Sequence, residues 1–278
     1  MSFIALYDEL IGYGGKDLFG DVLSPFIPSG KAIIEGLRHF SKLDNSFPGE
    51  IHEEDLWTLF ALNVCNDFLL LPLQVSSSEY RTFFTEIGLT LYEPGKTFNP
   101  LIHEIIGVGN WPSQKDGISL GACYWPGLMF GDLLISRCAV DVYCHPSWGV
   151  VKGIADSSKM YFTNRRIRRQ TTDQSDGWGH NSRWRTEFSR NYLVGEYALL
   201  NVDGSIDLYI DAGDFELNPL PLSAARELLL NRCFVSHETQ NDDYYPYDWK
   251  MAVNIKKCWP ITETSIVPFN LDSLCGRS

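Results

Sequence analysis

Hydrophobic residues recur at helical spacing in the first third of the chain. In three segments, apolar residues three or four positions apart share one face, which is the pattern of an amphipathic helix. The segments are PSGKAIIEGLRHFSKL (28–43), HEEDLWTLFALNVCNDFLLL (52–71) and SSSEYRTFFTEIGL (76–89). They predict an N-terminal helical layer that extends to about residue 93.

The ends of these segments carry helix signals. Ser29 is a candidate N-cap of the first segment. The second begins with three acidic residues, which suit a helix N-terminus, and stops before Pro72. The third opens with serines followed by Glu79, and Gly88 lies near its end.

From residue 94 onward the pattern changes to short runs rich in β-branched and aromatic residues, separated by Gly and Pro. Such runs predict strands. They are NPLIHEIIGV (99–108), LLISRCAVDVYC (133–144), GVVKGI (149–154), MYFTNRRI (160–167), RWRTEFSRNYLV (183–194), YALLNVDG (197–204) and IDLYI (206–210).

Turn and helix signals complete the second part of the chain. LVGEYAL and NVDGSIDL predict hairpin turns, and the Asp203-Gly204 pair is the stronger signal. SAARELLLNRCF (223–234) predicts a late helix capped by Ser223. We therefore expect an α+β fold: an N-terminal helical layer (about 1–93), then a mainly antiparallel sheet and a late helix (about 94–278), in one domain.

Composition and charge narrow the function classes. The 278 residues are 44% hydrophobic, and no apolar run is long enough to span a membrane. The N-terminus carries Asp8 and Glu9 and no basic region, so we expect a cytoplasmic protein. The net charge of −12 disfavours nucleic acid and anionic lipid as partners of the whole surface.

The charge is unevenly distributed. Residues 152–190 hold nine Lys or Arg and four acidic residues, so this stretch carries +5 and the remainder −17. We expect the basic stretch to bind either the chain's own carboxylates or an anionic ligand. RRIRR (165–169) beside Tyr161 and Phe162 would suit nucleic acid, but one short run in an acidic protein is a weak signal.

The densest group of polar chemistry lies in GWGHNSRWRT (177–186), within that basic stretch. His180 is a candidate general base that Asp176 would orient. Arg183 and Arg185 alternate onto one strand face and would clamp an anion, with Asn181 and Ser182 as hydrogen-bond donors. The alternative interpretation is structural, with the tryptophans in the core and the arginines paired with the chain's own acids.

The seven cysteines and the known catalytic motifs add little. The cysteines are odd in number and lie in apolar contexts, which predicts buried free thiols. A zinc site assembled from Cys138, Cys144, His145, Cys233 and His237 stays open, but the spacings fit no standard pattern. There is no GxSxG, P-loop or GxGxxG motif, so we expect no metal and no cofactor, and we favour a non-enzymatic role.

Several segments together resemble a group of bacterial proteins of unassigned activity. The segments are WPGLMFGDLL, RRIRR, GWGHNSRWRTEFSRNY, NVDGS and ARELLLNRCFV, within residues 56–236, and WGHNSRWRT is the specific part. The resemblance implies a bacterial, soluble, intracellular protein. It also implies that the 177–182 loop and the Asn201–Gly204 turn form a paired feature, which makes Asp203 a candidate ligand-binding residue.

Two functions follow from these patterns. The first is a bacterial protein-binding protein, concretely an immunity protein that neutralises a basic toxin domain through its acidic surface. The second is an enzyme or binder of an anionic small molecule, centred on Asp176, His180, Arg183 and Arg185.

Overall fold

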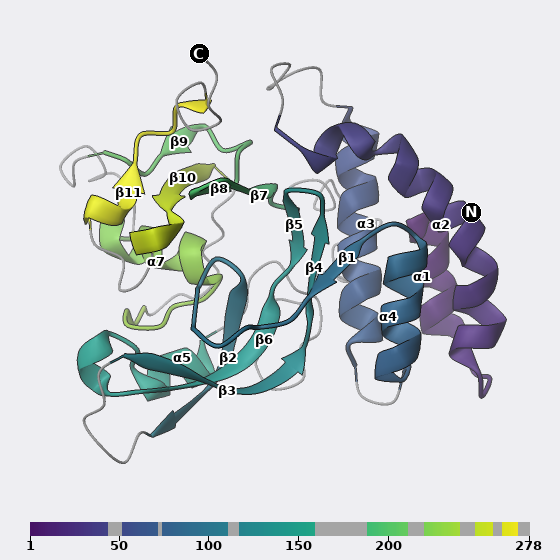
Figure 1. Ribbon diagram of the computed structural model, residues 1–278, viewed down its shortest axis with the longest axis horizontal. Helices are drawn as coiled ribbons and strands as arrows, with labels where there is room; N and C mark the ends of the chain where they lie inside the picture. The colour runs from purple at the N-terminus through teal and green to yellow at the C-terminus, as the bar shows by residue number, and fades with distance from the viewer. Residues whose placement is uncertain are drawn as a thin grey trace.

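The fold is α+β, as the sequence predicts (Figure 1). The computed structural model describes residues 1–43, 52–71, 74–110, 117–158, 188–210, 220–239, 248–257 and 263–271. Helices come first and strands follow. Among the described residues, the short α5 (Lys152–Ser157) and the longer α7 (Leu222–Asn231) come later, and α7 packs on the strands. Of the described helices, none is long and apolar enough to cross a membrane.

The N-terminal layer contains the predicted helices and one that the pattern missed. Its elements are α1 (Phe3–Gly12), a π-helical turn (Phe19–Leu23), α2 (Ser24–Gly36), a 3₁₀ turn (Arg38–Ser41), α3 (Glu53–Leu69) and α4 (Ser77–Glu86). The prediction that Ser29 caps the first segment is wrong, because α2 already begins at Ser24 and carries Pro28 in its second turn. The chain is already helical before α2, in the π-helical turn that follows Leu18, so the start of α2 has no side-chain cap.

The start of α4 matches the sequence prediction closely. Ser76 accepts a hydrogen bond from the Glu79 N–H at 3.3 Å, and the Glu79 carboxylate accepts one from the Ser76 N–H at 2.7 Å. This reciprocal capping box satisfies two backbone donors at the helix start. After the helix, Gly88 takes a φ of +104°, which a side chain would disfavour.

A large, mainly antiparallel sheet spans the molecule. Its antiparallel order is β1 (Thr90–Tyr92), β4 (Gly127–Phe130), β5 (Leu133–Ser136), β7 (Asn191–Val194), β8 (Tyr197–Leu200), β10 (Trp249–Asn254) and β11 (Ile266–Val267). The short β9 (Ile206–Asp207) pairs with β10 in parallel. The β7–β8 hairpin turns at Gly195, whose φ is +57°, as LVGEYAL predicts.

A smaller three-stranded sheet lies below the large one in Figure 1. In it, β6 (Cys138–Cys144) pairs in parallel with β2 (His103–Asn110) and antiparallel with β3 (Ile118–Trp125). Single residues separate β3 from β4 and β5 from β6, so two adjacent chain segments pass from one sheet to the other. These residues are Pro126, which cannot donate a ladder hydrogen bond, and Arg137.

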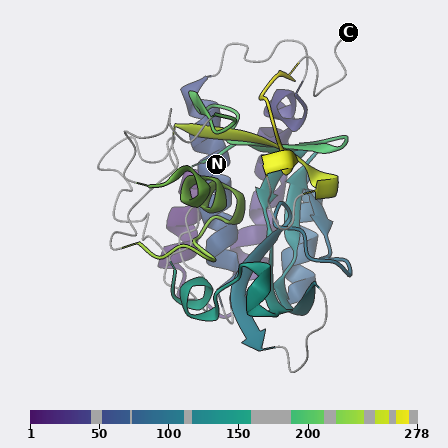
Figure 2. The same cartoon turned by 90° about the vertical axis from the view of Figure 1, so that its left-hand side faces the viewer.

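The large sheet is covered on both faces. Leu199 and Ala252 pack into the core beneath the N-terminal helices. Their strand neighbours Leu200 and Met251 point the other way and pack with α7. This alternation follows from the two-residue period of a strand and makes three layers, with α1–α4 and α7 on opposite sides (Figures 1 and 2).

Two predictions in the second part of the chain are wrong. GVVKGI is not a strand, because Lys152–Ser157 forms α5, where Lys152 pairs with Asp156 one turn later at 2.5 Å. NVDGSIDL is a turn but not a hairpin, because the flanking strands β8 and β9 each pair with β10. Gly204 lies close to β10, since a Cβ on it would be 2.6 Å from the Trp249 backbone. The predicted strand MYFTNRRI lies outside the described residues.

The cysteine prediction is confirmed where the structure describes the thiols. Cys65, Cys138, Cys144 and Cys233 are buried and free, whereas the free thiol of Cys123 is on an exposed residue. The other two cysteines lie outside the described residues. No disulfide joins the five described cysteines.

Candidate functional site

A serine, a histidine and a glutamate meet at the N-terminal end of α7. Ser223 and Glu227 are one helical turn apart and share a face of the helix. At the other end of α7, Arg232 takes a left-handed φ of +64° while its N–H still donates to Leu228 O at 2.8 Å. This C-terminal cap reverses the chain, and the following residues return along α7 as far as His237.

The returning segment is held from both sides. The Phe234 N–H donates to Ser158 Oγ at 3.0 Å, and Val235 O accepts from the Val151 N–H at 2.8 Å. These bonds tie the segment to both ends of α5. Its position is therefore determined by backbone hydrogen bonds and does not depend on side-chain packing alone.

Glu227 organises the segment from the helix side. Its carboxylate accepts hydrogen bonds from the Val235 N–H at 2.6 Å, the Ser236 hydroxyl at 3.1 Å and the His237 N–H at 3.2 Å. The Ser236 N–H is a further donor. The Glu227 side chain is only 8% exposed, and these donors satisfy the acceptor atoms of a nearly buried carboxylate.

His237 connects this carboxylate to the serine. Its Nδ1 bonds Glu227 Oε2, and its Nε2 lies 3.1 Å from Ser223 Oγ. An ionised carboxylate only accepts hydrogen bonds, so Nδ1 must carry the proton. In the neutral imidazole Nε2 is then the acceptor, and the Ser223 hydroxyl donates to it.

Ser223 occupies the second position of α7, after the N-cap Pro221. The sequence prediction that Ser223 caps the helix is therefore wrong. The first N–H groups of a helix have no intrahelical acceptor. In α7 these groups include the N–H groups of Leu222 and Ser223. They point towards the helix start, where the helix dipole favours negative charge.

A hollow of about 500 Å³ lies beside His237. The described residues that line it come from α5 and from the returning segment. They are Val151, Gly153, Ile154, Ser157, Ser158, Phe234, His237, Glu238 and Thr239. This volume lies within the range of small-molecule sites, and its lining combines apolar side chains with a few polar groups.

Six predicted site residues cannot be compared with this arrangement. Asp176, His180, Asn181, Ser182, Arg183 and Arg185 all lie outside the described residues. The seventh, Asp203, forms a two-point ion pair with Arg190, at 2.7 Å from Nε and 2.5 Å from Nη2. Arg190 is nearly buried and its guanidinium lies over the Phe40 ring, so Asp203 is held in an ion pair within the fold, and its part in ligand binding stays a prediction.

The basic stretch pairs with the chain's own acids where it is described. Arg190 bonds Asp203, and Lys152 bonds Asp156. This agrees with the first of the two alternatives for residues 152–190. The other seven basic residues of the stretch lie outside the described part of the chain.

The candidate zinc ligands do not converge. His145 Nδ1 lies 2.8 Å from Ser147 Oγ, and Cys233 Sγ donates to Asn231 O. The two ring nitrogens of His237 bond Glu227 and Ser223. Within the described residues, no three His, Cys, Asp or Glu side chains form a metal-binding group.

The relay of Ser223, His237 and Glu227 was missed by sequence reasoning. Its one local signal is the spacing of Ser223 and Glu227 on a predicted helix. Comparison with known proteins does not supplement that signal, since no family model, curated protein or solved structure matches the chain. The resemblance to the bacterial group therefore stays a prediction.

Proposed function

We propose that the protein is a serine hydrolase of the acyl-transfer type, acting on an ester or activated amide at Ser223. One observation carries the proposal: Ser223 Oγ lies 3.1 Å from His237 Nε2, while His237 Nδ1 bonds the nearly buried Glu227. A nucleophile, a base within hydrogen-bond reach and a group that orients the base are the three parts of such a site.

The geometry supports a two-step reaction. Ser223 Oγ attacks the carbonyl carbon while His237 Nε2 takes the hydroxyl proton, and the imidazolium then protonates the leaving alcohol as its bond to carbon breaks. Water, deprotonated by the same nitrogen, releases the acid and restores the serine. Glu227 stays ionised throughout and stabilises the imidazolium.

The start of α7 provides the charge stabilisation that this reaction needs. The oxyanion of each tetrahedral intermediate would face the N–H groups of Leu222 and Ser223. The hollow beside His237 would take the acyl or alcohol part of the substrate, and its Val151, Ile154 and Phe234 side chains favour an apolar group.

Turnover of p-nitrophenyl esters of increasing acyl length tests the proposal. We expect saturable hydrolysis by the wild-type protein and a loss of about 1,000-fold or more in kcat/KM for Ser223→Ala and for His237→Ala. Ser78→Ala, at an exposed serine of α4, is the matched control and should keep full activity. Equal turnover by wild type and Ser223→Ala would refute the proposal.

We propose protein binding as a second function, supported by the open face of the small sheet. Tyr124 and Tyr143 are each 40% exposed there, and the Tyr124 hydroxyl donates to Asp141 at 2.7 Å. A groove of about 290 Å³ runs beside Asp141, Tyr143 and the ion pair of Lys152 and Asp156. Aromatic and acidic groups together suit a basic protein surface, such as a toxin domain in a bacterial cytoplasm.

Calorimetric titration with basic toxin domains encoded by neighbouring genes tests this second proposal. We expect Tyr143→Ala to weaken a complex by about tenfold or more. Ile11→Ala, at a distant exposed apolar residue of α1, should leave it unchanged. Absence of any complex, or equal affinity of Tyr143→Ala and wild type, would contradict it.

A further inference from the structure

Two cysteines are cross-strand neighbours in the small sheet. Cys123 lies near the end of β3, opposite Val140 of β6, and Cys138 is the first residue of β6. Residues two apart on a strand point to the same side, so Val140 and Cys138 share a face. Cys123 is therefore the diagonal neighbour of Cys138 on that face.

A change of register keeps the end of β3 close to the start of β6. Cys123 pairs with Val140 and Trp125 with Ala139, so β3 contains one residue more than β6 at this point. The Trp125 Nε1–H also donates to Arg137 O at 3.2 Å. This bond ties the residue at the end of β3 to the residue that precedes Cys138.

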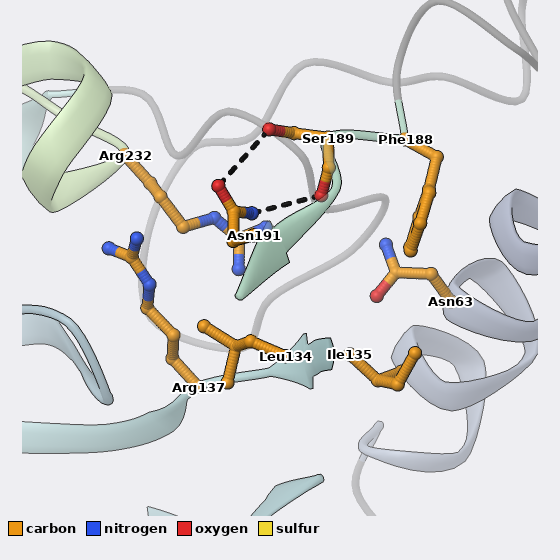
Figure 3. Close-up of a pocket in the computed structure, with 8 residues that line it drawn as sticks. All are labelled: Asn63, Leu134, Ile135, Arg137, Phe188, Ser189, Asn191 and Arg232. Atoms are coloured by element: carbon orange, nitrogen blue, oxygen red, sulfur yellow. Dashed lines mark hydrogen bonds between the residues drawn. The ribbon is translucent and has the colours of Figure 1, made fainter. Parts of the chain in front are cut away.

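Cys138 is the fixed member of the pair. It is fully buried, it packs with Val140, and its thiol donates to Tyr92 O at 3.4 Å. The preceding residue, Arg137, is also buried, and its side chain lines a small cavity beside α3, β5 and β7 (Figure 3). Burial on both sides of this peptide leaves Cys138 little freedom to move.

Cys123 is the accessible member. It is exposed, both thiols are free, and β3 stands at the end of the described strand order of the small sheet. The hydrogen bond that the Cys138 thiol donates to Cys123 lowers the pKa of Cys123, and the same bond together with burial raises the pKa of Cys138. An accessible, more acidic thiol beside a buried one is the arrangement in which the first reacts and the second resolves.

We propose that Cys123 is a site of reversible oxidation by hydroperoxides and that Cys138 resolves it as a disulfide. The Cys123 thiolate attacks a peroxide oxygen, the O–O bond breaks, and an alcohol or water leaves as Cys123 becomes a sulfenic acid. The Cys138 sulfur then attacks the Cys123 sulfur. The S–S bond forms, the S–O bond breaks, and the hydroxyl leaves as water with the Cys138 proton.

Formation of the disulfide requires a local movement of β3. Diagonal neighbours lie farther apart than directly opposed residues, so Cys123 must move towards Cys138. The register shift next to Cys123 and the end position of β3 in the sheet accommodate this movement. Exchange with a small thiol such as glutathione restores both cysteines. This proposal is independent of the reaction proposed at Ser223.

Peptide mapping under non-reducing conditions, after brief treatment of the reduced protein with hydrogen peroxide and then alkylation, tests the proposal. We expect a Cys123–Cys138 cross-linked peptide in wild type, and dithiothreitol should remove it. Cys123→Ser should abolish the cross-link. Cys144→Ala, at a buried free thiol on the same face of β6, is the matched control and should keep it.

Cys138→Ala separates the two steps of the reaction. Without the resolving thiol, the sulfenic acid at Cys123 should persist, and dimedone should trap at least about tenfold more of it than in wild type. The pH midpoint for alkylation of Cys123 should also rise, because the hydrogen bond from Cys138 is lost. If Cys138→Ala does not fold, the cross-link in wild type and its loss in Cys123→Ser decide. Oxidation of Cys123 without a bond to Cys138, or a bond from Cys123 to another cysteine instead, would overturn the proposal.

Discussion

The N-terminal end of α7 holds a polar cluster whose members are linked by hydrogen bonds, whereas the cluster that borders its C-terminal end includes buried polar atoms without a hydrogen-bond partner. In the first, the Glu227 carboxylate accepts from several donors, and His237 links it to the exposed Ser223. In the second, Arg137 Nε and Glu104 Oε1 are buried without hydrogen-bond partners.

The two clusters are suited to different roles. A fully bonded relay at the edge of a hollow is preorganised for proton transfer, because its geometry needs no rearrangement when a substrate arrives. In the second cluster the buried Arg137 Nε and Glu104 Oε1 lack hydrogen-bond partners, and leaving such atoms unsatisfied lowers stability. We therefore assign the proposed chemistry to the first cluster and expect changes in the second to act on the stability of the fold.

The largest effect should follow from changing the bonded cluster. Glu227→Gln replaces an ionised acceptor with an amide, so it weakens the hold on His237 Nδ1 and leaves some backbone donors unpaired. We expect ester hydrolysis to fall about 1,000-fold, equivalent to about 4 kcal/mol of transition-state stabilisation. The measurement is kcat/KM, with Glu35→Gln at the exposed Arg38 pair as control. Hydrolysis within twofold of wild type would remove the relay from the mechanism.

The next effect tests the buried charges of the second cluster. Glu104→Gln removes its described carboxylate, and we expect it to lower the free energy of unfolding by about 3–5 kcal/mol. Arg137→Met removes a buried guanidinium whose Nε has no hydrogen-bond partner, so it should cost less than half as much. Urea unfolding measures both, with Glu93→Gln as the exposed control. A larger loss for Arg137→Met than for Glu104→Gln would show that Arg137 is well compensated.

His103 provides a pH test of the same charge. It is buried, its Nδ1 accepts from the Asn99 N–H at 2.9 Å, and its Nε2 lies 2.7 Å from Pro94 O. Burial, and to a smaller extent the charge of Arg137, lower the pKa of His103 to about 4. Protonation is thus harder in the folded protein than in the unfolded chain, where a histidine titrates near 6.5.

This shift makes the protein less stable as the pH falls from about 6.5 to 4, because the unfolded state binds the extra proton first. The full contribution is about 3 kcal/mol, and it is retained above pH 6.5. His103→Gln should flatten the pH dependence of unfolding in this window. Arg137→Met should reduce it in part, and an unchanged slope in both variants would contradict the assignment.

The smallest predicted effect concerns a bonded cluster without a proposed function. The capping box of Ser76 and Glu79 should contribute about 1 kcal/mol, which Ser76→Ala would remove. Ser77→Ala, at the adjacent exposed serine, is the control and should change the free energy of unfolding by less than about 0.5 kcal/mol. Equal losses in both variants would mean that the box adds nothing beyond helix propensity.

Local signals predicted much of the fold. The capping box of α4, the acidic start of α3 and the turn at Gly195 depend on neighbouring residues, so they can be read directly from the sequence. The strand predicted over GVVKGI failed because a six-residue run does not distinguish a strand from a short helix. The hairpin predicted at Gly204 failed because that glycine serves a close approach to Trp249.

The candidate site could not be predicted, for a physical reason. Ser223 and His237 are brought together by the reversal at Arg232, a left-handed residue that is neither Gly nor Asn and so gives no sequence signal. The burial of Arg137 could not be predicted either, because an arginine between two strands is usually exposed, whereas Arg137 is 1% exposed.

Labelling with a fluorophosphonate probe, mapped by mass spectrometry, tests the central claim most directly. The probe forms a phosphonate ester with an activated serine and releases fluoride, so it reports the nucleophile without a known substrate. We predict one label per chain at Ser223, and a labelling rate at least 100-fold lower in His237→Ala. Labelling at Ser157 or Ser158 instead, or an unchanged rate at Ser223 in His237→Ala, would contradict the account.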